Sequence, residues 1–142
     1  TVMNWLPRKC VVVPYDFSEQ SLAAARLGRE FVEDASNLHV IHVLPELTVT
    51  EPGVIWSTID DASRMTHAKE AMEERLQDVS GAQLKVAFGD PGHMITDLAS
   101  EVTADLIVIP SHGRTGVQRL LLGSVAERVV RLAHCPVLVL RD

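Results

Sequence analysis

Short apolar runs that do not alternate with polar residues recur along this chain. The clearest is Leu106, Ile107, Val108 and Ile109, which stands between Asp105 and a proline. A strand that is apolar on both faces is typical of a parallel sheet covered by helices on both sides. Because segments with helical periodicity separate the runs, the sequence predicts an α/β fold with a parallel sheet and right-handed crossovers.

Five strands and four helices are expected in alternation. The strands are predicted at residues 9–14, 38–44, 83–88, 106–109 and 137–140, and the helices at residues 18–35, 58–79, 93–102 and 124–133. Ser18 is expected to cap the first helix. Its buried face is expected to hold residues that recur every four positions, namely Ala23, Leu27, Phe31 and Ala35. Residues 89–92, Gly-Asp-Pro-Gly, predict a turn, and residues 45–57 show no period.

Size, charge and cysteine content limit the function. A chain of 142 residues fits a single domain, which we place at residues 1–142. A net charge of −6 argues against a nucleic-acid partner, and no apolar run reaches the roughly 18–20 residues of a membrane span. Cys10 and Cys135 stand alone beside apolar runs, which is typical of reduced thiols in a cytoplasmic protein.

The segment 110–124, P-S-H-G-R-T-G-V-Q-R-L-L-L-G-S, joins a predicted strand to a predicted helix. Glycines let backbone N–H groups approach an anion, and a helix N-terminus adds unbonded N–H donors. Residues 110–131 contain four arginines and one acid, a local charge of 4 − 1 = +3. This pattern indicates a phosphate site. The alternative is that the glycines only form turns and that Ser124 and Glu127 form an ordinary capping box.

Several kinds of site are disfavoured by the motifs. The loop after the first strand, P-Y-D-F-S, contains neither a dinucleotide-binding G-x-G-x-x-G nor a P-loop sequence. No spacing indicates a metal site or a catalytic triad. His112 is the histidine of interest because it lies inside the glycine loop. If the strand order is 3-2-1-4-5, strands one and four are neighbours, so the loops that follow them meet. Ligands of open parallel sheets bind at this point, where the strand order reverses.

Three stretches of the chain resemble the universal stress protein family. They are V-V-V-P-Y-D-F-S-E at residues 11–19, Gly89-Asp90-Pro91, and S-H-G-R-T-G-V-Q-R-L-L-L-G-S followed by C-P-V-L-V-L at residues 111–124 and 135–140. The resemblance covers nearly the whole chain. It implies a five-stranded sheet of order 3-2-1-4-5 with helices on both faces, a homodimer paired along the fifth strand, and membership of the branch that holds ATP with G-x2-G-x9-G-S/T.

The resemblance also implies a set of nucleotide-binding residues. Pro14 and Asp16 are expected beside adenine and ribose, with Asp16 accepting a hydrogen bond from a hydroxyl, and Val43 is expected to present its backbone to adenine. His112 is expected beside the ribose or the phosphates. The residues expected along the phosphate loop are Pro110, Gly113, Gly123, Ser124, Val125 and Ala126. Pro110 replaces the first glycine of the family motif. Proline lacks the N–H but keeps its carbonyl, so binding survives only if this position serves through its carbonyl.

The function implied is that of a homodimeric sensor or switch that binds ATP, ADP or AMP, with Mg²⁺ or Mn²⁺ beside a triphosphate. No residue stands out as a general base, so we expect at most a weak ATPase. The alternatives are a scaffold whose pocket Pro110 blocks, and a related nucleotide-hydrolysing or nucleotide-transferring enzyme, which the lack of a lysine near the loop disfavours.

The last predicted strand favours self-association without the family resemblance. Val137, Leu138, Val139 and Leu140 carry no charge and include no proline. An open edge of this kind aggregates unless it is paired, which favours a dimer through this strand. The alternative is protection by the terminal Arg141-Asp142 and a neighbouring helix.

Overall fold

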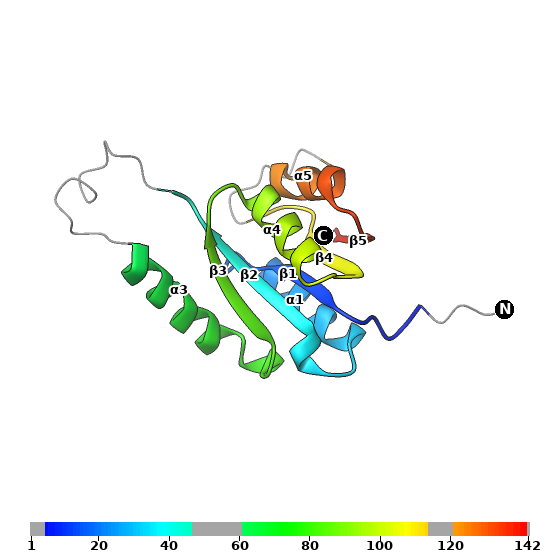
Figure 1. Ribbon diagram of the computed structural model, residues 1–142, viewed down its shortest axis with the longest axis horizontal. Coiled ribbons are helices and arrows are strands. Elements are labelled where there is room, and N and C mark those ends of the chain that lie inside the picture. Colours follow the sequence, from blue (N-terminus) through cyan, green and yellow to red (C-terminus); the bar gives the residue numbers. More distant parts are fainter. Residues whose placement is uncertain (1–4, 47–60, 114–120, 142) are drawn as a thin grey trace.

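The computed structural model describes residues 5–46, 61–113 and 121–141. One sheet of five parallel strands runs through it in the order β3-β2-β1-β4-β5, as predicted (Figure 1). The strands are β1 (Val11–Pro14), β2 (Leu38–Leu44), β3 (Gln83–Phe88), β4 (Leu106–Pro110) and β5 (Val137–Leu140). Strand order reverses between β1 and β4, so the carboxyl ends of these two strands form the switch point of the sheet.

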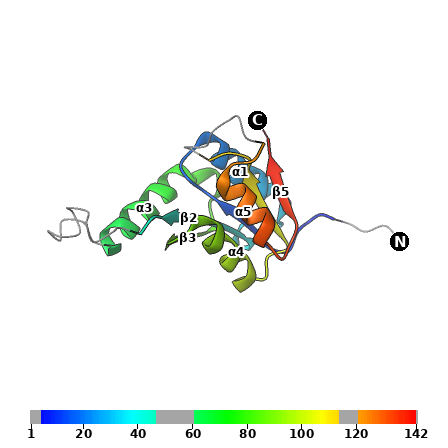
Figure 2. The ribbon, with the colours of Figure 1, turned by 90° about the horizontal axis from the view of Figure 1, so that it is seen from above.

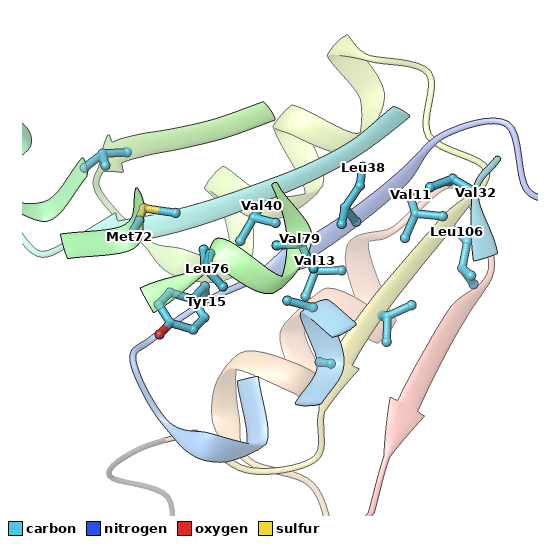
Figure 3. Packing of buried hydrophobic residues seen from close by; sticks show 14 residues of the cluster. Val11, Val13, Tyr15, Val32, Leu38, Val40, Met72, Leu76, Val79 and Leu106 are labelled. Atoms are coloured by element: carbon cyan, nitrogen blue, oxygen red, sulfur yellow. The ribbon is translucent and has the colours of Figure 1, made fainter. Parts of the chain in front are cut away.

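Helices cover both faces of the sheet (Figures 1 and 2). They are α1 (Glu19–Phe31), α3 (Asp61–Arg75), α4 (Pro91–Glu101) and α5 (Ser124–Leu132), with short 3₁₀ turns η1 (Ala35–Asn37) and η2 (Gln77–Val79). Val11 and Val13 pack with α1, α3 and η2 on one face (Figure 3), whereas Val12 packs with α4 and α5 on the other. Within the described residues, no helix has the length and apolar character needed to span a membrane.

The prediction for the first helix is right about its start and partly right about its buried face. Of the residues expected there, Leu27 and Phe31 pack against the core, whereas Ala35 lies beyond the helix in η1. Ser18 is the N-cap, and its side chain accepts a hydrogen bond from the Ser21 N–H. The helix ends at Phe31, and the buried residues are small: Ser21, Ala24, Ala25 and Gly28, while Ala23 is exposed. A Cβ placed on Gly28 would lie 2.8 Å from Val13 Cγ2. The helix therefore lies so close to β1 that only small side chains fit between them.

The start of α4 differs from the prediction, whereas α5 begins at Ser124 as predicted but with a different cap. The sequence 89–92 is not a separate turn, because Asp90 caps α4 and Pro91 occupies the first helical position, where its missing N–H costs nothing. Gly123, not Ser124, is the N-cap of α5, so the capping box does not form and Glu127 instead pairs with Arg131. The helix predicted at 58–79 appears as α3 followed by η2, and residues 58–60 lie outside the described part.

Candidate functional site

A cavity of about 120 Å³ opens at the switch point of the sheet. One water needs roughly 10–15 Å³, so the space is large enough for a group the size of a ring. Seven of the residues expected at the nucleotide site line it: Pro14, Asp16, Val43, Pro110, Gly113, Val125 and Ala126. The remaining walls are formed by Tyr15, Ser21, Ile41, His42, Pro91, Ile95 and Ile109. The three expected residues that do not line the cavity are His112, Gly123 and Ser124.

Asp16 lies in a tight turn between β1 and α1. Its Oδ1 accepts hydrogen bonds from the Ser18 N–H at 3.0 Å and from the Ser18 hydroxyl at 2.5 Å. The Asp16 N–H donates to Ser21 Oγ at 3.2 Å. These bonds satisfy the start of α1 and fix the carboxylate at the cavity, so one turn both caps the helix and presents an acid.

The loop after β4 meets this turn at Gly113. A Cβ placed on Gly113 would lie 3.2 Å from Asp16 Oδ2. The loops after strands one and four, which the sequence predicts to be neighbours, are therefore in contact at the cavity. A side chain at Gly113 would crowd the Asp16 carboxylate, so glycine here provides space beside that group.

Gly123 closes the loop that begins at Ser111. Its N–H donates to the Ser111 carbonyl at 2.6 Å, and the Ser111 N–H in turn donates to the Leu140 carbonyl at 2.7 Å. A Cβ on Gly123 would lie 3.1 Å from the Ser111 oxygen. The expected role of Gly123 as a phosphate donor therefore meets a competing bond inside the protein, and what glycine allows here is close contact between the two ends of the loop.

The N-terminus of α5 adjoins the cavity through Val125 and Ala126. The first bond of the helix runs from the Glu127 N–H to the Gly123 carbonyl at 2.9 Å, and no side chain caps the helix at Gly123. The N–H groups of residues 124–126 come before that bond and belong to the end of the helix that attracts anions. Ser124 is exposed at the first helical position.

His112 does not line the cavity. The residue is half-buried, and its Nδ1 is 3.2 Å from the Ser111 hydroxyl. Gly116, Arg114 and Arg119, which belong to the predicted phosphate loop and its positive charge, lie outside the described residues.

Pro110 is accommodated as the buried last residue of β4. The next residue, Ser111, continues the ladder to Leu140, so the proline does not interrupt the pairing of β4 with β5. Since the backbone here is an ordinary strand, the position does not need the conformational freedom of glycine.

Two features of the site did not stand out in the sequence. His42 lines the cavity, and its Nδ1 lies 2.8 Å from the Tyr15 carbonyl oxygen. Its only signal was its position next to Val43 at the end of a strand. The second feature joins α4 to α5: Asp90 accepts hydrogen bonds from the His93 ring and from Arg128, each at 2.7 Å.

These bonds have an electrostatic consequence at the wall formed by α4 and α5. The hydrogen bonds from the His93 ring and backbone, together with Arg128, lower the pKa of Asp90 to about 2. The aliphatic part of Arg128 covers Gly92, where a Cβ would lie 2.5 Å from Arg128 Cδ. The ion pair and the tight packing together fasten the two helices that contribute Ile95 and Val125 to the cavity. Within the described residues, no group of three His, Cys, Asp or Glu side chains is placed to hold a metal.

Comparison with known proteins agrees with this arrangement. The model of the universal stress protein family matches residues 7–141. The chain is similar to universal stress protein MJ0531 of Methanocaldococcus jannaschii, at 35% identity over 94% of this chain and 82% of that protein. The solved structure of MJ0577 from the same organism has a TM-score of 0.78 at 29% identity, covering 96% of this chain and 98% of that one.

A universal stress protein from Archaeoglobus fulgidus, solved in complex with dAMP, has a TM-score of 0.53 at 25% identity, covering 96% of this chain and 98% of that chain. The match of the family model over most of the chain, the sheet order and the similarity to MJ0531 agree with one another: the chain belongs to the universal stress protein family.

Proposed function

We propose that this protein binds an adenine nucleotide in the cavity between β1 and β4. The observation that carries the proposal is the cavity itself, which lies at the switch point and is lined from both loops that the sequence marks as functional. Ligands of open parallel sheets bind at this place. The complex of the Archaeoglobus fulgidus relative with dAMP supports an adenine nucleotide as the ligand class.

Each part of the cavity suits one part of such a ligand. Ile41, Val43 and Ile109 supply apolar walls for a base. The Asp16 carboxylate can accept a hydrogen bond from a sugar hydroxyl. The N-terminus of α5 and the loop at Gly113 suit phosphates, because backbone N–H groups and the helix dipole favour negative charge. Mg²⁺ or Mn²⁺ beside a triphosphate would be held mainly by phosphate oxygens and water.

The biological role we propose is that of a cytoplasmic homodimeric sensor or switch. β5 is an edge strand of the sheet, and its residues Val137, Leu138, Val139 and Leu140 are uncharged and only partly buried within one chain. Pairing with a second copy would cover this edge. Sedimentation equilibrium tests the dimer: a mass of twice 15.6 kDa is expected, and a single-chain mass at the highest soluble concentration contradicts it.

Calorimetry of nucleotide-stripped protein tests the binding. ATP with Mg²⁺, ADP and AMP are titrated into the wild type, Asp16→Asn and Asp97→Asn. Asp97 is an exposed acid on α4, so its variant removes the same charge away from the cavity. Asp16→Asn replaces a charged acceptor by a neutral amide, which weakens the hydrogen bond to the sugar hydroxyl and predicts about tenfold weaker binding. The control should bind like the wild type.

The same titration separates the alternatives. If wild-type protein does not bind at millimolar nucleotide, the protein is a scaffold and the proposal is wrong. If it binds and turns over ATP faster than about 1 s⁻¹, an ordinary enzyme rate, it belongs with the hydrolysing enzymes. Saturable binding with slower turnover, or none, is the outcome expected of a sensor.

A further inference from the structure

Phe17 occupies an unusual backbone conformation in the turn between β1 and α1. Its φ is 67°, in the left-handed region, where among the described residues the only other non-glycine is Thr103. Glycine or asparagine is the residue that such a turn ordinarily takes, because a bulky side chain is strained there. A strained aromatic residue beside a cavity suggests that its ring has a task that glycine could not perform.

The ring of Phe17 lies between two others. It meets Tyr15 edge-on at a centroid distance of 4.8 Å and an interplanar angle of 62°, and it meets His42 at 4.9 Å and 78°. Edge-to-face arrangements of this kind are favourable beyond the apolar area that they bury. We call Tyr15, Phe17 and His42 the aromatic clamp. Its contacts offset the strain of the turn and hold the Phe17 backbone in place.

The clamp also fixes the chain on the other side of Asp16. The Tyr15 N–H donates to the Ile41 carbonyl at 2.8 Å, and the Tyr15 carbonyl lies 2.8 Å from His42 Nδ1. A carbonyl oxygen can only accept, so Nδ1 carries the proton of the His42 ring. Tyr15 itself is buried in the same cluster as Met72 and Leu76 (Figure 3). Both polar groups of the Tyr15 backbone are thus bound to β2.

Asp16 lies between these two anchored residues. Its Oδ1 accepts from Ser18, and its Oδ2 lies beside Gly113 at the cavity. We infer that Phe17 and His42 are positioning residues, which hold the Asp16 carboxylate at the angle needed to receive a sugar hydroxyl and thereby make the site prefer ribonucleotides. This inference rests on the proposed nucleotide site, and it adds how that site selects its sugar.

The test compares AMP with its 2′-deoxy and 3′-deoxy analogues by calorimetry. In the wild type, AMP should bind about tenfold tighter than at least one deoxy analogue, which is the worth of one such hydrogen bond. Phe17→Gly removes the ring and relieves the backbone. It should bring this ratio close to one while changing the affinity for the deoxy analogue less than about twofold. A merely structural role would weaken all three ligands equally.

A double-mutant cycle shows whether Phe17 acts through Asp16. In an Asp16→Ala background, Phe17→Gly should change AMP affinity less than twofold, since the group that it positions is gone. If Phe17→Gly does not fold, Phe17→Leu takes its place, with Phe31→Leu as the matched control. Phe31 is a half-buried aromatic residue at the far end of α1, where its ring meets Trp5. Phe31→Leu should keep the wild-type ratio.

The outcomes separate this inference from the proposed function. If wild-type protein binds none of the three ligands, the nucleotide site is wrong and the inference falls with it. If the wild type binds but shows no preference for AMP, or if Phe17 and Asp16 substitutions are additive, the nucleotide site stands and the role of the clamp is wrong. His42→Phe, which keeps a ring but cannot donate to Tyr15, should lower the ratio as Phe17→Gly does.

Discussion

Replacement of Gly123 by alanine tests how the loop before α5 is closed. The Gly123 backbone, with φ −69° and ψ 165°, is one that alanine adopts without strain. The new methyl group would instead lie 3.1 Å from the Ser111 carbonyl oxygen and 3.3 Å from His112 Cα. Both neighbours are backbone atoms, so they cannot rotate away, and the 2.6 Å hydrogen bond from Gly123 to Ser111 must lengthen.

The expected loss of stability can be worked out from these contacts. Overpacking of this kind costs about 1–3 kcal/mol. The smaller conformational freedom of alanine in the unfolded chain returns about 0.4–1 kcal/mol. Taking the middle of each range, the free energy of unfolding should fall by about 1.3 kcal/mol, which for a domain of 142 residues corresponds to a decrease of about 4 °C in Tm.

Thermal unfolding followed by circular dichroism measures this difference, and Gly113→Ala is the matched control. Its methyl group would lie 3.2 Å from one side-chain oxygen, Asp16 Oδ2. A shift of a few tenths of an ångström relieves that contact while Oδ1 keeps its bonds to Ser18, so the stability should stay within about 0.5 kcal/mol of wild type. A Gly123→Ala variant as stable as wild type, or more stable, would show that the two ends of the loop are not in close contact and would refute the reasoning.

Three further predictions concern the fold around the site. The pKa of Asp90 is lowered from 3.8 to about 2, so the stability that its carboxylate contributes is present above pH 3.8 and is lost as the pH falls towards 2. In urea unfolding at a series of pH values, Asp90→Asn should therefore reduce the decrease in the free energy of unfolding between about pH 4 and pH 2. An unchanged decrease would contradict the bonds to His93. Gly28→Ala should lower the free energy of unfolding by about 1 kcal/mol, because its methyl group would lie 2.8 Å from Val13 Cγ2 and the overpacking outweighs the better helix propensity of alanine. Higher stability than wild type in guanidinium denaturation would be the contrary result. Burial and the nearby Asp105 carboxylate raise the pKa of the Cys135 thiol, so less of it is in the reactive thiolate form at neutral pH. Cys135 should therefore react with an aromatic disulfide reagent more slowly in the folded protein than in the unfolded chain, and equal rates would contradict its burial.

The sheet and the place of the site could be predicted from the sequence because both depend on local patterns. Apolar runs such as Leu106–Ile109 are apolar on both faces, and they identify buried parallel strands without knowledge of their neighbours. The family resemblance then added the strand order, which no local pattern contains. The positions after β1 and β4, including Asp16 and Gly113, follow from these two together.

What the sequence did not predict depends on distances between elements. The fully buried residues of α1 include Ala24, Ala25 and Gly28 because that helix lies close to β1. The large apolar residues Leu27 and Phe31 also pack against the core, but they do not reveal that the residues in closest contact with β1 are small. Whether Gly123 or Ser124 caps α5 depends on where the chain returns to Ser111, since both residue types are good caps.

The role of His42 could not be predicted for a related reason. A histidine within a strand is ordinarily a surface or core residue, and nothing in its neighbours along the chain relates it to Tyr15 or Phe17. Only the pairing of β1 with β2 brings these residues together. Contacts across a sheet depend on register, and register is set by the whole fold.

A crystal structure grown with excess AMP tests the central claim most directly. The account predicts a nucleotide in the cavity between β1 and β4, with its base against Val43, a sugar hydroxyl within hydrogen-bond distance of Asp16, and its phosphate at Gly113 and the N-terminus of α5. A nucleotide bound elsewhere on the protein, or a cavity that contains only water beside an intact Asp16 turn, would contradict it.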